Sequence, residues 1–238
     1  MIRAALTLFA LVWLASGCAY HEADPQLTRR FTWFSYLNGD DIRARCGTDK
    51  RPRYRFVYNG VYTRQVRTYD IAANERGAGF LLTARAFNPF LLSSIEIDVP
   101  GLLSGQDPSQ GLQPWAGTTA KVPLADHDLD ALDAALAVSG FFRPPPVGAR
   151  LSSDGFYWIG VACIGGRVIF NAYAWPSSRF DDATFPALLF DWDQTGVAVE
   201  PPHERPFSGL DEDPQSKGMH IFTITIGRDG LAGTGTLF

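Results

Sequence analysis

Apolar and polar positions alternate along much of the chain, on either side of short turn signals. The sharpest example spans residues 53–58 and 61–71, which flank the dipeptide Asn59-Gly60. Asn-Gly readily adopts the positive φ angles of a two-residue hairpin turn, so this stretch predicts a β-hairpin. A loop of two residues also sets the register of the two strands.

The predicted register gives this hairpin two different faces. One face is aromatic and suited to a core, whereas the other collects Arg53, Arg55 and Arg64 beside Tyr62. Arg55 directly opposite Arg64 is unfavourable unless an acidic group or water lies between them. We therefore take Arg53, Arg55, Tyr62 and Arg64 as a candidate surface for a partner or an anionic ligand.

Other segments with alternating or aromatic-rich patterns predict further strands. A second hairpin should run through residues 155–164 and 167–175, turn at Gly165-Gly166 and carry Cys163 on its apolar face. The remaining segments expected to be strands are 30–37, 79–87, 90–99, 115–124, 187–192, 196–199, 219–226 and 231–237.

One segment has the period of a helix. Leucines recur at helical spacing between about residues 126 and 139, aspartates stand at its start, and Gly140 is placed to end it. The sequence therefore predicts a mainly β fold of about eight to ten antiparallel strands, in a barrel or a sandwich, with one α-helix. We expect one domain over residues 27–238, with a division near Pro144–Pro146 as the alternative.

The composition fits a folded chain rich in turns. Hydrophobic residues make up 46% and charged residues 19% of the sequence, and 23 Gly and 16 Pro favour strands joined by turns. Residues 18–85 hold 12 Lys/Arg against 7 Asp/Glu, whereas residues 86–238 hold 8 against 18. Such asymmetry is typical of a basic part with an acidic partner, or of two parts that face each other or are solvated.

The N-terminus has the pattern of a targeting segment. Arg3 gives a positive start, residues 4–14 are apolar, and three small residues precede Cys18. This apolar run is shorter than the ~20 residues that a bilayer-spanning helix needs. The segment resembles a bacterial lipoprotein signal, in which Cys18 matches the lipobox cysteine, although Ala15 stands where leucine is commonest.

The resemblance implies cleavage after Gly17 and acylation of Cys18. Residues 1–17 would then be the signal peptide and residues 18–26 a short tether, and several acyl chains would hold the protein stably on a membrane. Ala19 in place of aspartate favours the periplasmic face of the outer membrane, by the sorting rule of enteric bacteria. An ordinary secretory signal with a chance cysteine is the alternative.

The other two cysteines can be interpreted in two ways. With Cys18 acylated, Cys46 and Cys163 are an even pair in an oxidising compartment, which predicts a disulfide. Alternatively, the cations around Cys46, such as Arg45 and Arg51, would stabilise a thiolate and make it a nucleophile.

A carboxylate pair is a second candidate for chemistry. If residues 187–192 are a strand, its alternation carries Asp191 and Asp193 to one face, as an acid/base pair requires. The sequence has no P-loop, dinucleotide fingerprint, Gly-x-Ser-x-Gly or His-Glu-x-x-His motif. We therefore predict no metal site and no cofactor.

Two classes of function follow. The favoured one is a non-enzymatic binding or structural module of the cell envelope. It is lipid-anchored, its partner is an envelope protein, an envelope glycan or a small anionic ligand, and no nucleic acid is expected. The alternative is a periplasmic enzyme, either a hydrolase or a thiol-dependent activity, that uses Cys46 or the Asp191/Asp193 pair.

Overall fold

Two antiparallel sheets form the centre of the fold. The computed structural model describes residues 33–49, 51–62, 64–75, 77–87, 117–204 and 222–236. Its strands are β1 (Arg53–Gly60), β2 (Gln65–Ala73), β3 (Phe80–Phe87), β4 (Thr118–Leu124), β5 (Arg150–Ser152), β6 (Phe156–Ile164), β7 (Arg167–Ala174), β8 (Phe222–Ile226) and β9 (Leu231–Thr236). The larger sheet has the order β4-β3-β2-β1-β6-β7, and the smaller one has the order β5-β8-β9.

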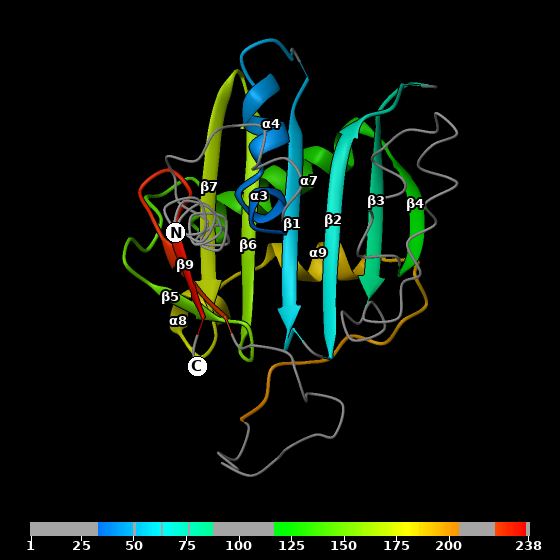
Figure 1. The fold of residues 1–238 in the computed structure, drawn as a ribbon. Coiled ribbons are helices and arrows are strands. Elements are labelled where there is room, and N and C mark those ends of the chain that lie inside the picture. The colour runs from blue at the N-terminus through cyan, green and yellow to red at the C-terminus, as the bar shows by residue number, and fades with distance from the viewer. Residues whose placement is uncertain are drawn as a thin grey trace, which may run out of the picture.

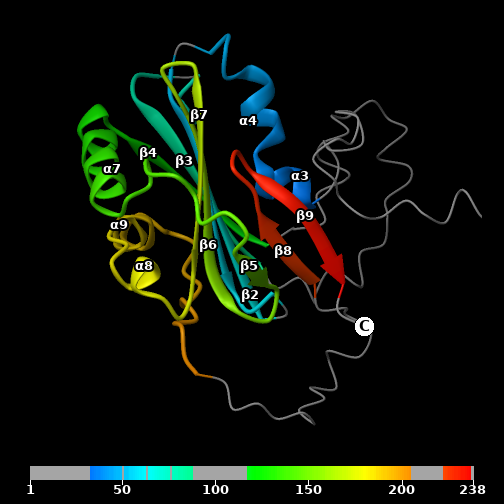
Figure 2. The same cartoon turned by 90° about the vertical axis from the view of Figure 1, so that its left-hand side faces the viewer.

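Helices and the small sheet cover the two faces of the six-stranded sheet. The helices are α3 (Trp33–Asn38), α4 (Asp40–Arg45), α7 (Asp126–Val138), α8 (Ser178–Asp181) and α9 (Phe185–Asp191). Helices α7, α8 and α9 lie on one face, whereas α3, α4 and the three-stranded sheet lie on the other (Figures 1 and 2). The predicted mainly β fold is confirmed, and the two sheets face each other as in a sandwich.

The alternation along β1 and β6 separates two hydrophobic cores. Phe56 of β1 packs under α7 and α9, whereas its neighbour Val57 packs under α3, α4 and the small sheet. Gly160, in the middle of β6, is needed because a Cβ there would lie 2.6 Å from the ring of Phe141. The absence of a side chain at Gly160 thus allows Phe141 to pack in the same core as Phe56.

Two predicted elements are confirmed closely. Strands β6 and β7 form a hairpin in which Ile164 pairs with Arg167 across Gly165-Gly166, and both glycines have positive φ. Helix α7 occupies the predicted segment, and Gly140 follows it with a φ of 68°. Both rest on local signals that no distant part of the chain opposes.

The predicted register of the β1–β2 hairpin is wrong. Val57 pairs with Thr68 and Arg55 pairs with Asp70, so the loop consists of residues 61–64 rather than Asn59-Gly60. The pairing is offset by six residues, and an even offset keeps every side chain on its predicted face. Arg55 therefore faces an acid across the ladder in place of Arg64.

Asn59 belongs to strand β1 because its side chain has a role inside the fold. Its amide donates hydrogen bonds to the carbonyls of Ser153 (3.0 Å) and Gly155 (2.6 Å), and the residue is buried. Val61 supplies the positive φ of the turn, at 64°. A buried amide bonded to a distant loop outweighs the local preference of Asn-Gly for a tight turn.

Two segments predicted as strands are helical. In α3, Trp33 and Leu37 lie one helical turn apart and are both buried. In α9, Phe185 and Leu189 have the same spacing and are also buried. Short apolar runs do not distinguish strand from buried helix by their pattern alone. The expected strand 196–199 is irregular, and the expected strand 90–99 lies outside the described residues, as does Cys18.

A buried ion pair holds helix α4 against the sheet. The Arg55 guanidinium donates to Asp70 across the ladder (2.6 Å) and to Asp41 of α4 (2.7 Å). It also lies over the ring of Tyr36, 3.8 Å from the centroid. Arg55 thus contacts α3, α4 and strand β2 at once and links the two helices to the large sheet.

Replacing Arg55 should therefore destabilise the protein strongly. Arg55→Met removes the buried guanidinium that Asp41 and Asp70 share, but Asp70 keeps Arg85 at 3.1 Å and Asp41 is half exposed. We therefore expect a loss of about 2–3 kcal/mol in the free energy of unfolding. Arg64→Met is the matched control, because Arg64 is half exposed and lies 3.6 Å from Glu200, and it should cost less than about 1 kcal/mol. Urea unfolding of both variants at pH 7 measures the difference, and equal losses would contradict the register described here.

Candidate functional site

A disulfide fixes the end of helix α4 on the large sheet. Cys46, directly after α4, is bonded to Cys163 of β6, with the two Cα atoms 5.5 Å apart. The predicted pairing of these cysteines is present. On the chain-entropy model, closing a loop of this length is worth about 4–5 kcal/mol. Because Arg53 opposes Cys163 at the start of strand β1, the disulfide holds Cys46, and with it Arg45, near Arg53.

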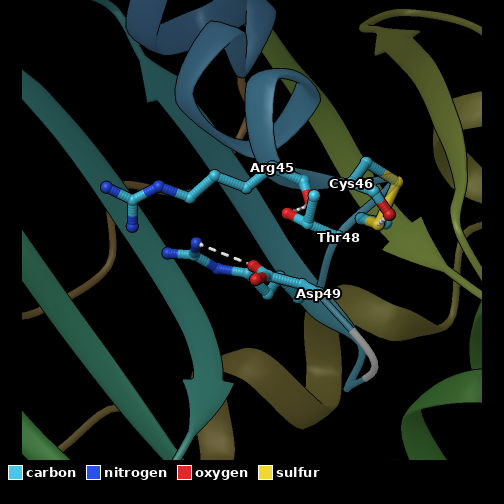
Figure 3. Close-up of a disulfide and its surroundings, with 6 residues drawn as sticks. Arg45, Cys46, Thr48 and Asp49 are labelled. Atoms are coloured by element: carbon cyan, nitrogen blue, oxygen red, sulfur yellow. Dashed lines mark hydrogen bonds and ion pairs between the residues drawn. A yellow bond between two sulfur atoms is a disulfide. The ribbon is translucent and has the colours of Figure 1, made fainter.

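A basic hollow of about 320 Å³ lies beside this disulfide. Figure 3 shows Arg45 and Asp49 reaching over the same part of the sheet, away from the disulfide. We call this site the basic hollow and define it by its lining residues, which are Arg45, Asp49, Arg51, Arg53, Ala72, Ala73 and Glu75. Three guanidinium groups thus border the hollow against two carboxylates.

The three arginines of the basic hollow are engaged to different degrees. Arg53 lies 3.4 Å from the Asp49 carboxylate. Arg51 donates to the carbonyl of Gly79 (2.7 Å) and lies over the Phe80 ring, 4.3 Å from its centroid. Within the described ranges, no acid or acceptor pairs with the guanidinium of Arg45. Arg45 is therefore available to a bound anion.

The structure separates the four residues of the predicted surface. Arg53 lines the basic hollow, but Arg55 is buried in its ion pairs. Tyr62 packs against Trp33 and Phe222, and burial raises its pKa to about 12. Arg64 lies beside Glu200 at the opposite end of β1. They do not form one patch, and of the four only Arg53 lines the basic hollow.

The predicted carboxylate pair is also separated. Asp191 ends helix α9 and is exposed, whereas the side chain of Asp193 is 4% exposed and forms an ion pair with Arg67 (2.5 Å). Asp193 also accepts hydrogen bonds from the hydroxyls of Tyr69 (2.8 Å) and Thr195 (2.5 Å). Its oxygens are occupied by these donors, so it anchors the chain after α9.

These contacts determine the charge state of Asp193. Burial by itself would raise the pKa of its carboxyl group, but hydrogen bonds from Thr195 and Tyr69 and the charge of Arg67 outweigh it. The pKa is therefore below its ordinary value of 3.8. A carboxyl group held ionised in this way is unsuited to donate a proton near neutral pH.

The described residues contain no group of three or more His, Cys, Asp or Glu arranged to hold a metal ion. No helix among them is both long and apolar enough to cross a membrane.

Asp193→Asn tests the anchoring role through its pH dependence. At pH 7 the variant should lose on the order of 3 kcal/mol, because Arg67 is left buried without its counter-ion. The pKa of Asp193 is lowered in the folded state, so its contribution is complete above the unfolded pKa and disappears as pH falls through the folded one. The gap between wild type and variant should thus be constant from pH 7 to about 5 and shrink below about 4.

Urea unfolding over this pH range measures that gap. Asp191→Asn is the control, since it removes an exposed carboxylate two residues away and should change stability by less than about 0.5 kcal/mol. A gap for Asp193→Asn that is unchanged at pH 3 would show that the ion pair is not its source.

Comparisons with known proteins add no assignment: no protein family, curated protein or solved structure matches this chain.

Proposed function

We propose that this chain is a lipid-anchored protein of the bacterial cell envelope whose folded part binds a small anionic ligand without catalysis. The ligand binds in the basic hollow through Arg45, Arg51 and Arg53. Phosphate and carboxylate groups are its expected chemistry, because the planar guanidinium group donates two parallel hydrogen bonds to either.

One observation carries this proposal: three arginines from separate positions converge on one hollow, and one of them has no counter-ion among the described residues. Surface arginines elsewhere are commonly solvated individually, but here the backbone that bears them is fixed by the Cys46–Cys163 bond. A preorganised set of donors binds an anion more tightly than mobile ones, because less side-chain freedom is lost. The hollow is small, which favours a compact ligand.

The enzymatic alternative finds less support. A thiol-dependent reaction requires a free thiolate, and the sulfur of Cys46 is bonded to Cys163. An acid/base pair requires Asp191 and Asp193 to face one substrate, whereas Asp193 is engaged by Arg67. Binding without chemistry is the function that these contacts favour.

The proposed location comes from the sequence. Cys18 of the lipobox-like segment would carry the acyl chains, and the tether of residues 18–26 reaches about 30 Å when fully extended. The folded part would then work close to the periplasmic face of the outer membrane. A ligand at that surface is expected to be a phosphate- or carboxylate-bearing component of the envelope.

Anion binding can be measured with inorganic pyrophosphate as the probe. Isothermal titration of the purified protein at low ionic strength should show binding that weakens strongly in 0.5 M salt. Arg45→Met and Arg53→Met should each weaken it by about tenfold, the effect of losing one charge-assisted contact of about 1.4 kcal/mol.

Arg150→Met is the matched control, because Arg150 is an exposed arginine on β5, away from the basic hollow. It should leave pyrophosphate affinity unchanged. If Arg45→Met and Arg150→Met bind pyrophosphate equally well, the basic hollow is not the anion site.

Lipid anchoring is tested separately at Cys18. Wild-type protein expressed in a bacterium should fractionate with membranes and incorporate a palmitate analogue, whereas Cys18→Ser should incorporate none and leave the membrane fraction. Ala15→Leu, which brings the segment closer to the lipobox pattern, should be processed like wild type. Labelled, membrane-bound Cys18→Ser protein would refute acylation at this residue.

A further inference from the structure

A second hollow lies on the opposite face of the large sheet, between the β1–β6 pair and the helices α8 and α9. Its volume is about 520 Å³, within the ~300–1,000 Å³ that is typical of small-molecule sites. Figure 2 shows α8 and α9 on this face, away from α3 and α4. We call it the aromatic pocket and define it by its lining residues, which are Tyr58, Trp158, Phe180, Asp181, Ala183, Pro186, Phe190, Val199, Pro201 and Pro202.

The inner side of the aromatic pocket is made of rings held in place by one another. The ring centroids of Tyr58 and Trp158 are 5.0 Å apart, and the Phe190 ring lies 5.7 Å from Tyr58 and 5.4 Å from Trp158. The Tyr58 hydroxyl donates to the carbonyl of Glu200 (2.6 Å) and is thereby satisfied. Tyr58 and Trp158 are almost fully buried and form the floor of the pocket, whereas Phe180, Ala183 and Phe190 are partly exposed and supply the apolar surface that a ligand can reach.

Two polar side chains of strand β2, those of Arg67 and Gln65, fix the outer wall. Residues 193–202, which we call the strap, cross the large sheet after α9 and complete the pocket. Arg67, fully buried, pairs with Asp193 and donates to the carbonyl of Val197. Gln65 donates to the carbonyl of Ala198 (2.7 Å) and accepts from the N–H of Glu200 (3.0 Å). The wall is therefore held by side chains of strand β2.

The charge of the aromatic pocket has one sign. Asp181 of α8 is the only lining residue with a full charge, and no Lys, Arg or His among the described residues lines the pocket. Arg67 of β2, which holds the strap, is neutralised by Asp193. The faces of aromatic rings carry partial negative charge and attract cations. The aromatic rings and the Asp181 carboxylate thus both favour a ligand with a positive charge.

We propose that the aromatic pocket binds a small apolar cation, such as an alkyl or aryl amine, independently of the basic hollow. The apolar part of the ligand lies against Phe180 and Phe190, above the buried rings of Tyr58 and Trp158, and its ammonium group lies beside the exposed carboxylate of Asp181. An anion would meet Asp181 without a compensating donor. A sugar would bring hydroxyl groups that this lining leaves without partners, which is costly once they leave water.

A matched series of eight-carbon probes tests the charge preference. Octylammonium, 1-octanol and octanoate share one chain and differ in the charge of the head group. Isothermal titration at low ionic strength should show octylammonium binding at least about fivefold more tightly than octanol, and octanoate more weakly than either. Tight octanoate binding, or no binding of octylammonium at millimolar concentration, would overturn the proposal.

Substitutions locate the site. Asp181→Asn should bring the affinity for octylammonium down to that for octanol and leave octanol unchanged, whereas Asp182→Asn, which alters the neighbouring acid outside the pocket, should have no effect. Ala183→Trp should fill the pocket and abolish binding of both probes, with Val199→Trp as a second filling variant from the opposite wall. Unchanged octylammonium binding in folded Asp181→Asn or in both filling variants would overturn the proposal, and the urea unfolding midpoint of each variant serves as the fold control.

Discussion

The antiparallel pairing of β1 with β6 is the constraint on which the rest of the structure depends. It joins strands about a hundred residues apart in sequence and runs from Arg53 opposite Cys163 to Tyr58 opposite Trp158 and beyond. Because side chains alternate along a strand, these two pairs point to opposite faces of the sheet. The basic hollow therefore forms at one end of the ladder and the aromatic pocket toward the other, on opposite faces.

Two buried arginines extend this constraint to segments outside the sheet. Arg55 of β1 binds Asp41 and Asp70 on the face of α4, and Arg67 of β2 binds Asp193 on the face of α9. Burying a guanidinium is costly unless acids and carbonyls surround it, so each arginine accepts only one arrangement of its neighbours. Charge thus adds to the apolar packing of Ile42 and Val199 and to the Cys46–Cys163 bond in positioning helix α4 and the strap.

The sequence predicted the elements whose signals are local. The β6–β7 hairpin follows from Gly165-Gly166 between alternating strands, and α7 follows from its leucines and Gly140. The β1–β2 register depends on contacts made later in the chain, above all those of Asn59 with residues 153 and 155. No pattern within residues 53–71 reveals that dependence. The same holds for α9, whose apolar run is helical because of the sheet beneath it.

The sequence likewise indicates one of the two candidate sites and not the other. The basic stretch before β1 was visible as a cluster of cations, and folding selects Arg45, Arg51 and Arg53 from it, whereas Arg55 is drawn into the interior by Asp41 and Asp70. The aromatic pocket could not be predicted from the sequence, because its aromatic residues have the pattern of core residues. Its outer wall is the strap, which has no regular pattern. The position of the strap depends in part on Arg67, a residue that no sequence pattern singles out. The buried pair of Arg67 and Asp193 therefore helps to place the strap that forms the outer wall of the aromatic pocket.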